Sequence, residues 1–351
     1  MSTTGVSNYF FENWAKTYSC IPKLYFEPQT IVDLQSIVCE AHKRKEKIRV
    51  VGCGHSPSAI CTTDGYMISM KHLNKIREVN KDEMYVEVES GVTIQQLNDE
   101  LPKWDLCLPN QGSISELTLT GLVSTASHGT GINYGTMSSY IRSITLMLLD
   151  GTIKEYSPTD EFLYWLATYI PRLIPYINQF YLWHESTHSL IIEDRCDKIF
   201  NFDCLFRQYV NEWAIPLKET AYVLHKLQSW LDENQHVIRV HFPIEIRFVK
   251  RDTHVMLSPT SGELEGNFCY INIIMYRPYE KDIEYEPWWH AFEAICLEVN
   301  GRPHWAKAHS LTSKTLRKLY PNAWDKFHEI RRQFDPHDQL VNDYLHRMFE
   351  E

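Results

Sequence analysis

The sequence predicts an α+β protein with two domains, and three observations support this fold class. Apolar side chains recur at helical spacing over 33–45, and a β-rich apolar run follows them directly. In the second half of the chain, long β-rich runs alternate with helix-like segments. The chain has 351 residues, which is long enough for two hydrophobic cores. We therefore expect one domain over 1–158 and a second over 159–351.

The first domain is expected to alternate helices with strands. The strands predicted within it are 48–51, 66–70, 84–89, 144–148 and 152–156. Thr93 and Gln96 match a capping box, which indicates that a helix begins there. Ile144 and Leu146 share one apolar face of their strand, and the Asp150-Gly151 pair predicts the turn that follows.

The second domain is expected to form a sheet with covering helices. Its β-rich runs are 237–249 and 268–276, and its helix-like segments are 288–299 and 322–334. Helices that follow strands in this way can cover one face of a sheet. We expect this sheet to form the roof of a binding site.

Residues 162–183 differ from their surroundings, because aromatic and aliphatic side chains dominate and Arg172 is the only charge. The segment approaches the roughly 20 residues that a membrane-spanning helix requires. Pro171 and Pro175 disfavour a clean span, since they would leave backbone groups unsatisfied in lipid. A membrane-surface helix pair, a buried element of the second domain and a span all remain open, and we favour the membrane surface.

Composition argues against some classes of partner and site. The net charge of −10 argues against a nucleic-acid partner, whose phosphates require a basic face. Nine cysteines without a C-x-x-C pair indicate reduced thiols rather than a disulfide framework, and they indicate no metal site. Residues 1–14 lack a basic start followed by an apolar run, so we expect no cleaved secretory signal.

A glycine-rich turn follows the strand predicted at 48–51. Its candidate ligand-binding residues are Gly52, Cys53, Gly54, His55, Ser56 and Ser58. Glycines let the backbone turn with its N–H groups aimed at an anion, and the serine hydroxyls add donors. A histidine held there beside a bound cofactor could attack an electrophilic carbon. A glycine-rich turn alone is weak evidence, so its companions in the sequence decide its meaning.

Glu245 and Arg247 lie two residues apart in a β-rich run, so their side chains project from the same face of the strand. Ile244, Ile246 and Phe248 are expected to pack in the opposite direction. From the residues alone, a solvent-facing ion pair on an amphipathic strand is the more common outcome. The alternative is a carboxylate and a guanidinium that face a ligand together.

Four short blocks occur in a fixed order, and together they resemble a known family. They are Gly54-His55-Ser56-Pro57-Ser58, Gly112-Ser113-Ile114-Ser115-Glu116, Ser127-His128-Gly129-Thr130-Gly131 and Gly301-Arg302-Pro303-His304-Trp305-Ala306-Lys307. The chain resembles the aldonolactone oxidases, most of all those of animals that act on L-gulonolactone. These belong to the vanillyl-alcohol-oxidase-type flavoproteins, which carry FAD covalently on a histidine. The resemblance extends over nearly the whole chain, including 213–216 and 332–336.

The resemblance implies roles for particular residues. It implies a PCMH-type FAD-binding domain over 1–158, a substrate or cap domain over 159–351, and FAD attached covalently to His55. Further candidate FAD contacts are Gly112, Ser113, Ser115, Gly121, Ser124, Thr125, Ser127, His128, Gly129 and Gly131. The candidate catalytic residues are Glu245 and Arg247, which would contact the substrate, and Lys307, which would place positive charge near it. For His304, core packing, substrate contact and acid–base chemistry remain open, with core packing ranked first.

The resemblance also implies an activity. We expect FAD-dependent oxidation of an aldono-1,4-lactone, with L-gulono-1,4-lactone as the substrate, to a 2-keto lactone that leads to L-ascorbate. Dioxygen would accept the electrons and yield hydrogen peroxide. The animal enzymes of this family are associated with the endoplasmic reticulum membrane, which favours a membrane-surface location for this chain.

The sequence departs from the family after the strand predicted at 152–156. The family continues there with a helix and a glycine-rich strand that close the cofactor domain, whereas this chain passes almost directly to the aromatic segment at 162. The missing stretch exceeds a βαβ unit of about 30 residues. We expect part of the FAD pocket wall to be absent and strand edges to be exposed. Two interpretations follow: a working oxidase, or a non-catalytic, membrane-associated remnant that cannot hold FAD.

Overall fold

The structure is a computed structural model, and it describes residues 4–156, 207–234, 236, 238, 240, 244–261, 266–277 and 282–349. Its helices are α1 Ile31–Arg44, α2 Ile94–Glu100, α3 Leu119–Ser124, α7 Thr220–Asn234, α8 Glu286–Glu298, α9 Ser313–Leu319, α10 Trp324–Phe334 and α11 Asp343–Phe349. Its strands in the first half are β1 Phe11–Glu12, β2 Ser19–Cys20, β3 Leu24–Phe26, β4 Ile48–Val51, β5 Tyr66–Ser69, β6 Ile76–Asn80, β7 Tyr85–Val88, β8 Ile144–Met147 and β9 Ile153–Tyr156. Those in the second half are β10 Gln208–Pro216, β11 Glu245–Val249, β12 Phe268–Tyr276 and β13 Arg302–Pro303.

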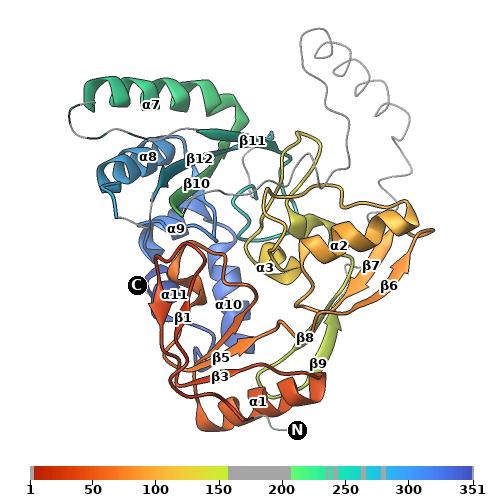
Figure 1. The fold of residues 1–351 in the computed structure, drawn as a ribbon. Helices are drawn as coiled ribbons and strands as arrows, with labels where there is room; N and C mark the ends of the chain where they lie inside the picture. Colours follow the sequence, from red (N-terminus) through yellow and green to blue (C-terminus); the bar gives the residue numbers. More distant parts are fainter. Residues whose placement is uncertain are drawn as a thin grey trace.

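A short antiparallel β1–β2 pair precedes a parallel sheet of order β3-β5-β4, and α1 lies against that parallel sheet (Figure 1). Thr30 caps the start of α1 in a capping box with Asp33, and Lys45 ends the helix in the left-handed conformation. The helix buries Ile37 and Val38 in a cluster that also contains side chains from β4 and β5. The predicted helix at 33–45 and the strands beside it are confirmed.

A second unit combines the β6–β7 hairpin with α2. Thr93 and Gln96 form the predicted capping box, because the side chain of each bonds to the backbone N–H of the other. Ile94 and Leu97 of α2 are buried with Leu122 of α3 in a separate cluster. This cluster supports the loops that carry the second and third sequence blocks.

The β8–β9 hairpin forms as predicted, with its strands joined through a turn at Gly151. Its apolar face is not buried. Ile144 and Leu146, which share that face, are 37% and 40% exposed. Hydrophobic alternation therefore predicted the two strands correctly. It did not indicate whether other elements of the protein cover their apolar face.

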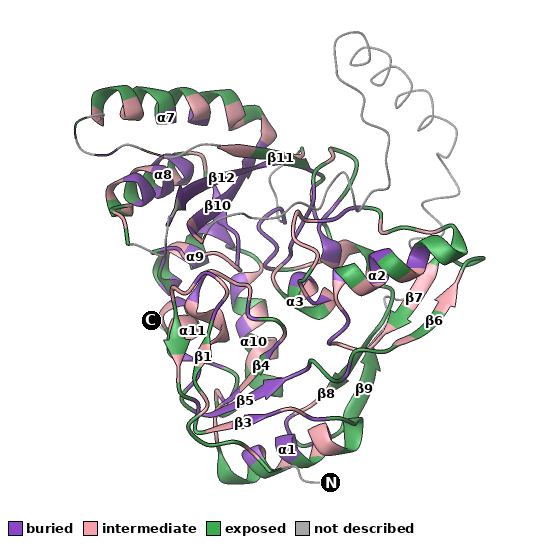
Figure 2. Cartoon of the chain, in the orientation of Figure 1, coloured by how far each residue is buried: buried purple, intermediate pink, exposed green. Residues whose placement is uncertain are grey.

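The second half of the chain forms an antiparallel sheet of order β11-β12-β10-β13. The central strands β10 and β12 are buried along most of their length, as Figure 2 shows in purple. Trp213 on β10 lies opposite Ile271 on β12, and both belong to a large core that α7 and α8 cover. The predicted strand 268–276 and the helices near 288–299 and 322–334 are confirmed.

The β-rich run predicted at 237–249 contains a shorter strand, since β11 starts at Glu245. The expectation that Ile246 and Phe248 pack into a core is wrong, because they are 37% and 41% exposed. The physical reason is position: β11 is the edge strand of its sheet, and it pairs with β12 alone among the named strands. The alternation itself is correct, since Glu245 and Arg247 occupy the better-buried face.

The aromatic segment at 162–183 lies outside the described residues. Within the residues that are described, no helix has both the length and the apolar character to cross a membrane. The cysteines in this part of the chain are free thiols, as expected.

Candidate active site

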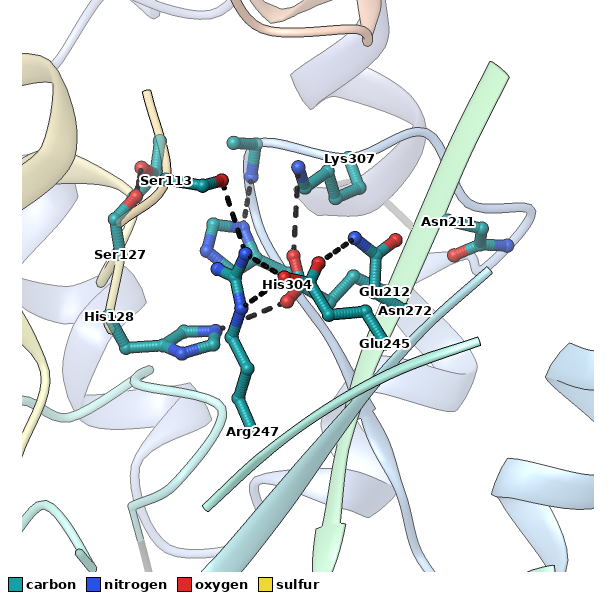
Figure 3. Close-up of polar contacts among 12 residues, drawn as sticks. Ser113, Ser127, His128, Asn211, Glu212, Glu245, Arg247, Asn272, His304 and Lys307 are labelled. Atoms are coloured by element: carbon teal, nitrogen blue, oxygen red, sulfur yellow. Dashed lines mark hydrogen bonds and ion pairs between the residues drawn. The ribbon is translucent and has the colours of Figure 1, made fainter. Parts of the chain in front are cut away.

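Contacts between distant segments bring the four sequence blocks together, and Figure 3 shows residues of the second, third and fourth blocks. In the first block, the Ser56 hydroxyl donates to the carbonyl of Ala306 in the fourth. In the second, the Ser113 hydroxyl accepts from Arg247 on β11. In the third, the backbone N–H of Gly131 donates to the carbonyl of Phe248 at 2.7 Å. Segments far apart in sequence therefore meet at the edge of the β11–β12 sheet.

The glycine turn after β4 requires its glycines. Gly54 has φ +68°, a conformation that side chains with Cβ rarely adopt. A methyl group on Gly52 would lie 2.3 Å from Oγ1 of Thr118, so only glycine fits that close approach. Trp14 donates its backbone N–H to the carbonyl of Gly54 at 2.9 Å, and Cys53 is exposed at the tip.

His55 lies beside this turn with its imidazole stacked on Trp14, the ring centroids 5.3 Å apart. The guanidinium of Arg207 lies on Trp14 as well, 4.8 Å from the ring centroid. Burial lowers the pKa of His55. The negative charge of Glu116 raises this pKa, whereas the positive charges of Arg207 and Lys307 lower it further. Its Nδ1 atom is buried and has no hydrogen-bond partner among the described residues. His55 is thus a neutral imidazole with an uncommitted nitrogen, the form that a nucleophile requires.

The chain's C-terminal region closes over the glycine turn. Tyr344 hydrogen-bonds to the side chain of Ser58, which itself lies 3.2 Å from the Ser56 hydroxyl. The Tyr344 hydroxyl also donates to the carbonyl of Lys307 at 3.0 Å. Asn342 donates its side-chain amide to carbonyls of the following turn, including that of Thr62 at 2.8 Å. The first and fourth blocks are thereby held together by groups that the sequence patterns did not reveal.

Glu245 and Arg247 form an ion pair that faces the second block rather than open solvent (Figure 3). Arg247 donates two N–H groups to Oε1 of Glu245, one of them at 3.0 Å, and a third to the Ser113 hydroxyl at 3.2 Å. Asn272 on β12 donates to Oε2 of Glu245 at 3.0 Å. The side chains of Arg247 and Glu245 are only 15% and 25% exposed. The pair is thus fixed in orientation and partly shielded from water.

The third block packs tightly against the residues just before the second. A methyl group on Gly129 would lie 2.1 Å from Oδ1 of Asn110 and 2.2 Å from the carbonyl oxygen of Gln111. Ser127 and His128 are buried, and the hydroxyls of Ser127 and Thr125 lie 3.0 Å apart. The block is therefore a rigid part of the site.

The other candidate FAD contacts occupy several positions around this block. Gly131 has φ +141° where it meets β11, and Gly112 lies beside the carbonyl of His128. Ser115 accepts a backbone hydrogen bond from Gln95 at 2.8 Å. Gly121 and Ser124 belong to α3, and both are exposed. The structure gathers most of these residues near the site, with Gly121 and Ser124 at its outer margin.

Glu212 on β10 is a site residue that the sequence patterns missed. Its carboxylate lies 3.4 Å from Nε2 of His128 and 3.6 Å from Nζ of Lys307, and the residue is only 2% exposed. Burial alone would raise the pKa of Glu212, but Lys307, with help from His128 and His304, holds it well below 4.5. An acidic residue within an apolar strand, directly before Trp213, is the signal that could have revealed it.

His304 and Tyr270 complete the interior of the cluster. Tyr270 on β12 stacks on His128, with ring centroids 3.5 Å apart. His304 is 3% exposed, and its Nδ1 accepts the backbone N–H of Ala306 at 3.1 Å. Burial lowers the pKa of His304 to about 3, so its ring is neutral. Core packing, the role ranked first for His304, agrees with this burial.

The described residues fit an FAD-type cofactor at one specific point. A glycine turn that aims backbone toward an anion lies directly beside an imidazole with a buried, unpartnered nitrogen. Between that turn and the sheet, Arg247 and Lys307 supply positive charge next to donor hydroxyls. Such an arrangement suits an electron-rich ring system and an oxygen-rich substrate.

Family models match both halves of the chain. Residues 149–348 match the D-arabinono-1,4-lactone oxidase family, and residues 22–157 match an FAD-binding domain. The two matches meet at 149–157, close to the expected domain boundary, which stays a prediction. FAD is therefore the cofactor of this chain.

Relatives with assigned names extend over nearly the whole chain. An L-gulonolactone oxidase of Scyliorhinus torazame is 35% identical over 442 residues, covering 98% of this chain and 99% of that protein. An L-gulonolactone oxidase of Mus musculus is 31% identical over 436 residues, covering 97% and 98%. Because both alignments are longer than the 351 residues of this chain, they contain stretches of the relatives with no counterpart here. The expectation of a shortened chain agrees with this.

Solved structures show the fold. A variant of cholesterol oxidase from Brevibacterium sterolicum matches with a TM-score of 0.75 over 99% of this chain and 98% of that chain, at 14% sequence identity. This likeness supports the predicted two-domain α+β fold of the FAD-binding type. Since the sequence resemblance is confirmed by family model and relatives alike, the chain belongs to the D-arabinono-1,4-lactone oxidase family of FAD-dependent oxidases.

Proposed function

We propose that this chain oxidises an aldono-1,4-lactone, with L-gulono-1,4-lactone as its substrate, and that its FAD is attached covalently to His55. The product would be a 2-keto lactone that leads to L-ascorbate, and dioxygen would be reduced to hydrogen peroxide. One observation carries the proposal: the Glu245–Arg247 pair and Lys307 face the same region beside the glycine turn. The names of the relatives support the substrate class.

The reaction removes two electrons and two protons from a secondary alcohol of the lactone ring. FAD, when bound, supplies the acceptor for a hydride from the alcohol carbon and passes the electrons on to dioxygen. The hydroxyl proton leaves to a base or to water. Dioxygen with two electrons and two protons gives hydrogen peroxide, so atoms and charge balance.

The chain's own residues would bind and orient the polyol. Arg247 presents a guanidinium held at a fixed angle by Glu245 and Ser113, which suits hydrogen bonds to lactone oxygens. Lys307 would place a second positive charge where negative charge develops on the substrate oxygen. Because these side chains are anchored before the substrate arrives, little reorganisation is needed.

The covalent link to His55 is supported by its neutral ring and its unpartnered Nδ1 atom. In His55→Ala, flavin should become extractable by acid or denaturant, whereas in the unchanged protein the yellow colour should precipitate with the polypeptide. As a matched control, His72→Ala should keep the tether, because His72 is an exposed histidine whose ring contacts Glu27 at 3.2 Å. A tether that persists in His55→Ala would refute the assignment of the nucleophile.

The alternative expected from the shortened sequence is a non-catalytic remnant. It is not favoured, because the blocks that carry the resemblance still meet in one place. The purified protein tests both functions: it should be yellow and should form peroxide with at least one of L-gulono-, L-galactono- and D-arabinono-1,4-lactone. Colourless protein, or yellow protein that is inert toward all three, would favour the remnant.

Association with the endoplasmic reticulum membrane remains part of the proposal, and it rests on the composition of 162–183. Deleting this segment should move the protein from the membrane to the soluble fraction. Full-length protein that is already soluble without detergent would contradict this part of the proposal.

A further inference from the structure

Glu212 lies in the candidate site on an interior strand of the second sheet. It belongs to β10, which pairs with β12 on one side and β13 on the other. The titratable groups that face it come from three further segments: His128 in the third block, Tyr270 on β12, and His304 with Lys307 in the fourth block. A carboxylate placed among these groups can fix their positions.

The contact with His128 depends on where the protons of that ring lie. His128 Nδ1 lies 2.9 Å from the carbonyl of Gly129, and because a carbonyl can only accept, Nδ1 carries a proton. Nε2 lies 3.4 Å from the Glu212 carboxylate. The carboxylate therefore lies against the edge of the His128 ring, whose face is covered by Tyr270.

The same bonds disfavour a metal ion here. His128, Glu212 and His304 offer ligand atoms within 4.8 Å of one another. However, His304 Nδ1 accepts the Ala306 N–H, which leaves the ring proton on Nε2 and no free lone pair for a metal. The ammonium of Lys307, 3.6 Å from Glu212, already supplies the opposite charge. The cluster is therefore built to hold charged side chains.

We propose that Glu212 is a positioning residue, which anchors the Lys307 ammonium and the His128 ring in the geometry that lactone oxidation requires. Lys307 has a flexible side chain that is 21% exposed, so without an anion it could turn toward water. Glu212 is 2% exposed and cannot follow it. This inference rests on the proposed function, in which Lys307 acts on the substrate.

Glu212→Gln tests the role of the charge at nearly constant shape. In flavin-loaded protein, the second-order rate constant for anaerobic flavin reduction by L-gulono-1,4-lactone should fall about 100-fold, with flavin content unchanged. In a Lys307→Met background, the same substitution should cost less than about threefold, because residues that act through one another are not additive. Glu212→Asp should recover part of the loss.

Glu293 provides a matched control. It is likewise a buried glutamate, and it lies on α8, where it accepts hydrogen bonds from the Asn211 amide and from the backbone N–H of Ser310. Glu293→Gln should leave the flavin-reduction rate within about threefold of the unchanged protein, since its hydrogen bonds go to Asn211 and Ser310 and not to Lys307 or His128. A 100-fold loss in Glu293→Gln as well would mean that any buried charge loss disables the protein, and would overturn the positioning role.

A second measurement does not require turnover. Reductive methylation followed by peptide mass spectrometry reports how accessible Lys307 is, and Glu212→Gln should make its methylation several-fold faster. Equal methylation rates, or full additivity with Lys307→Met, would overturn the inference. If the unchanged protein oxidises no lactone but Glu212→Gln still frees Lys307, the proposed function fails while the anchoring of Lys307 by Glu212 stands.

Discussion

Removing the guanidinium of Arg247 should abolish most lactone oxidation while leaving the fold and the flavin in place. Arg247 makes two bonds to Glu245 and one to Ser113 from the edge strand β11. In Arg247→Ala, all three are lost, and the substrate loses a fixed, charged donor. Losing a preorganised donor of this kind lowers turnover about 10²- to 10³-fold.

The cost in stability should be much smaller. Glu245 keeps its bond from Asn272 and its side chain is 25% exposed, so water can replace part of what Arg247 provided. We expect a loss of about 1–2 kcal/mol in the free energy of unfolding. The activity of Arg247→Lys should lie between that of the unchanged protein and that of Arg247→Ala, because a lysine keeps the charge but cannot make the paired bonds.

The assay is steady-state peroxide formation with L-gulono-1,4-lactone at matched flavin absorbance, together with denaturant unfolding. Arg77→Ala is the control, since Arg77 of β6 forms an ion pair with Glu89 but its side chain is exposed. Arg77→Ala should change neither the rate of peroxide formation nor the free energy of unfolding appreciably. If kcat/KM of Arg247→Ala stays within about threefold of the unchanged protein, Arg247 has no role in substrate binding.

Three further predictions concern single residues. The pKa of Glu212 is lower in the folded protein than in the unfolded chain, so its contribution to stability is complete above the unfolded pKa and is lost as the pH falls through the folded pKa. The unfolding midpoint of the unchanged protein should therefore drop more between about pH 5 and pH 3 than that of Glu212→Gln. Gly129→Ala should cost about 3 kcal/mol in unfolding experiments, whereas Gly112→Ala, whose methyl group would make only an ordinary contact 3.5 Å from its neighbour, should cost much less. Trp14→Ala should lower the fraction of protein that carries acid-stable flavin, measured by absorbance after precipitation, because the ring that orients His55 is gone.

Much of the fold was predictable because local signals and tertiary packing agree. The capping boxes at Thr30 and Thr93 fix where α1 and α2 begin, although only the second was predicted from sequence. The alternating and continuous apolar runs located β4, β5 and β12 because those strands are buried in sheets. Such signals are local, so a single sequence suffices to read them.

The errors arose where position in the sheet decides burial. Ile246 and Phe248 alternate like core residues but lie on an edge strand, where they are exposed. A pattern of alternation cannot tell which neighbours a strand will have. The same limit hid Glu212, whose partners His128 and Lys307 are distant in sequence and meet it only after folding.

The candidate site was predictable mainly through its motifs. The glycine turn, the Glu245–Arg247 pair and Lys307 were named from sequence, and the structure brings them into one region. The hydrogen bonds that orient these residues were not predicted, because Tyr344, Asn342 and Asn272 donate them from elements that are distant in the sequence. Hydrogen bonds of this kind leave no periodic trace in a sequence.

Anaerobic mixing of the purified, flavin-containing protein with L-gulono-1,4-lactone tests the central claim most directly. We expect the visible flavin absorbance to bleach and to return when air is admitted, with one equivalent of peroxide released for each flavin reoxidised. Absorbance that stays unchanged with every aldonolactone tried would contradict the assignment of this chain as a lactone oxidase.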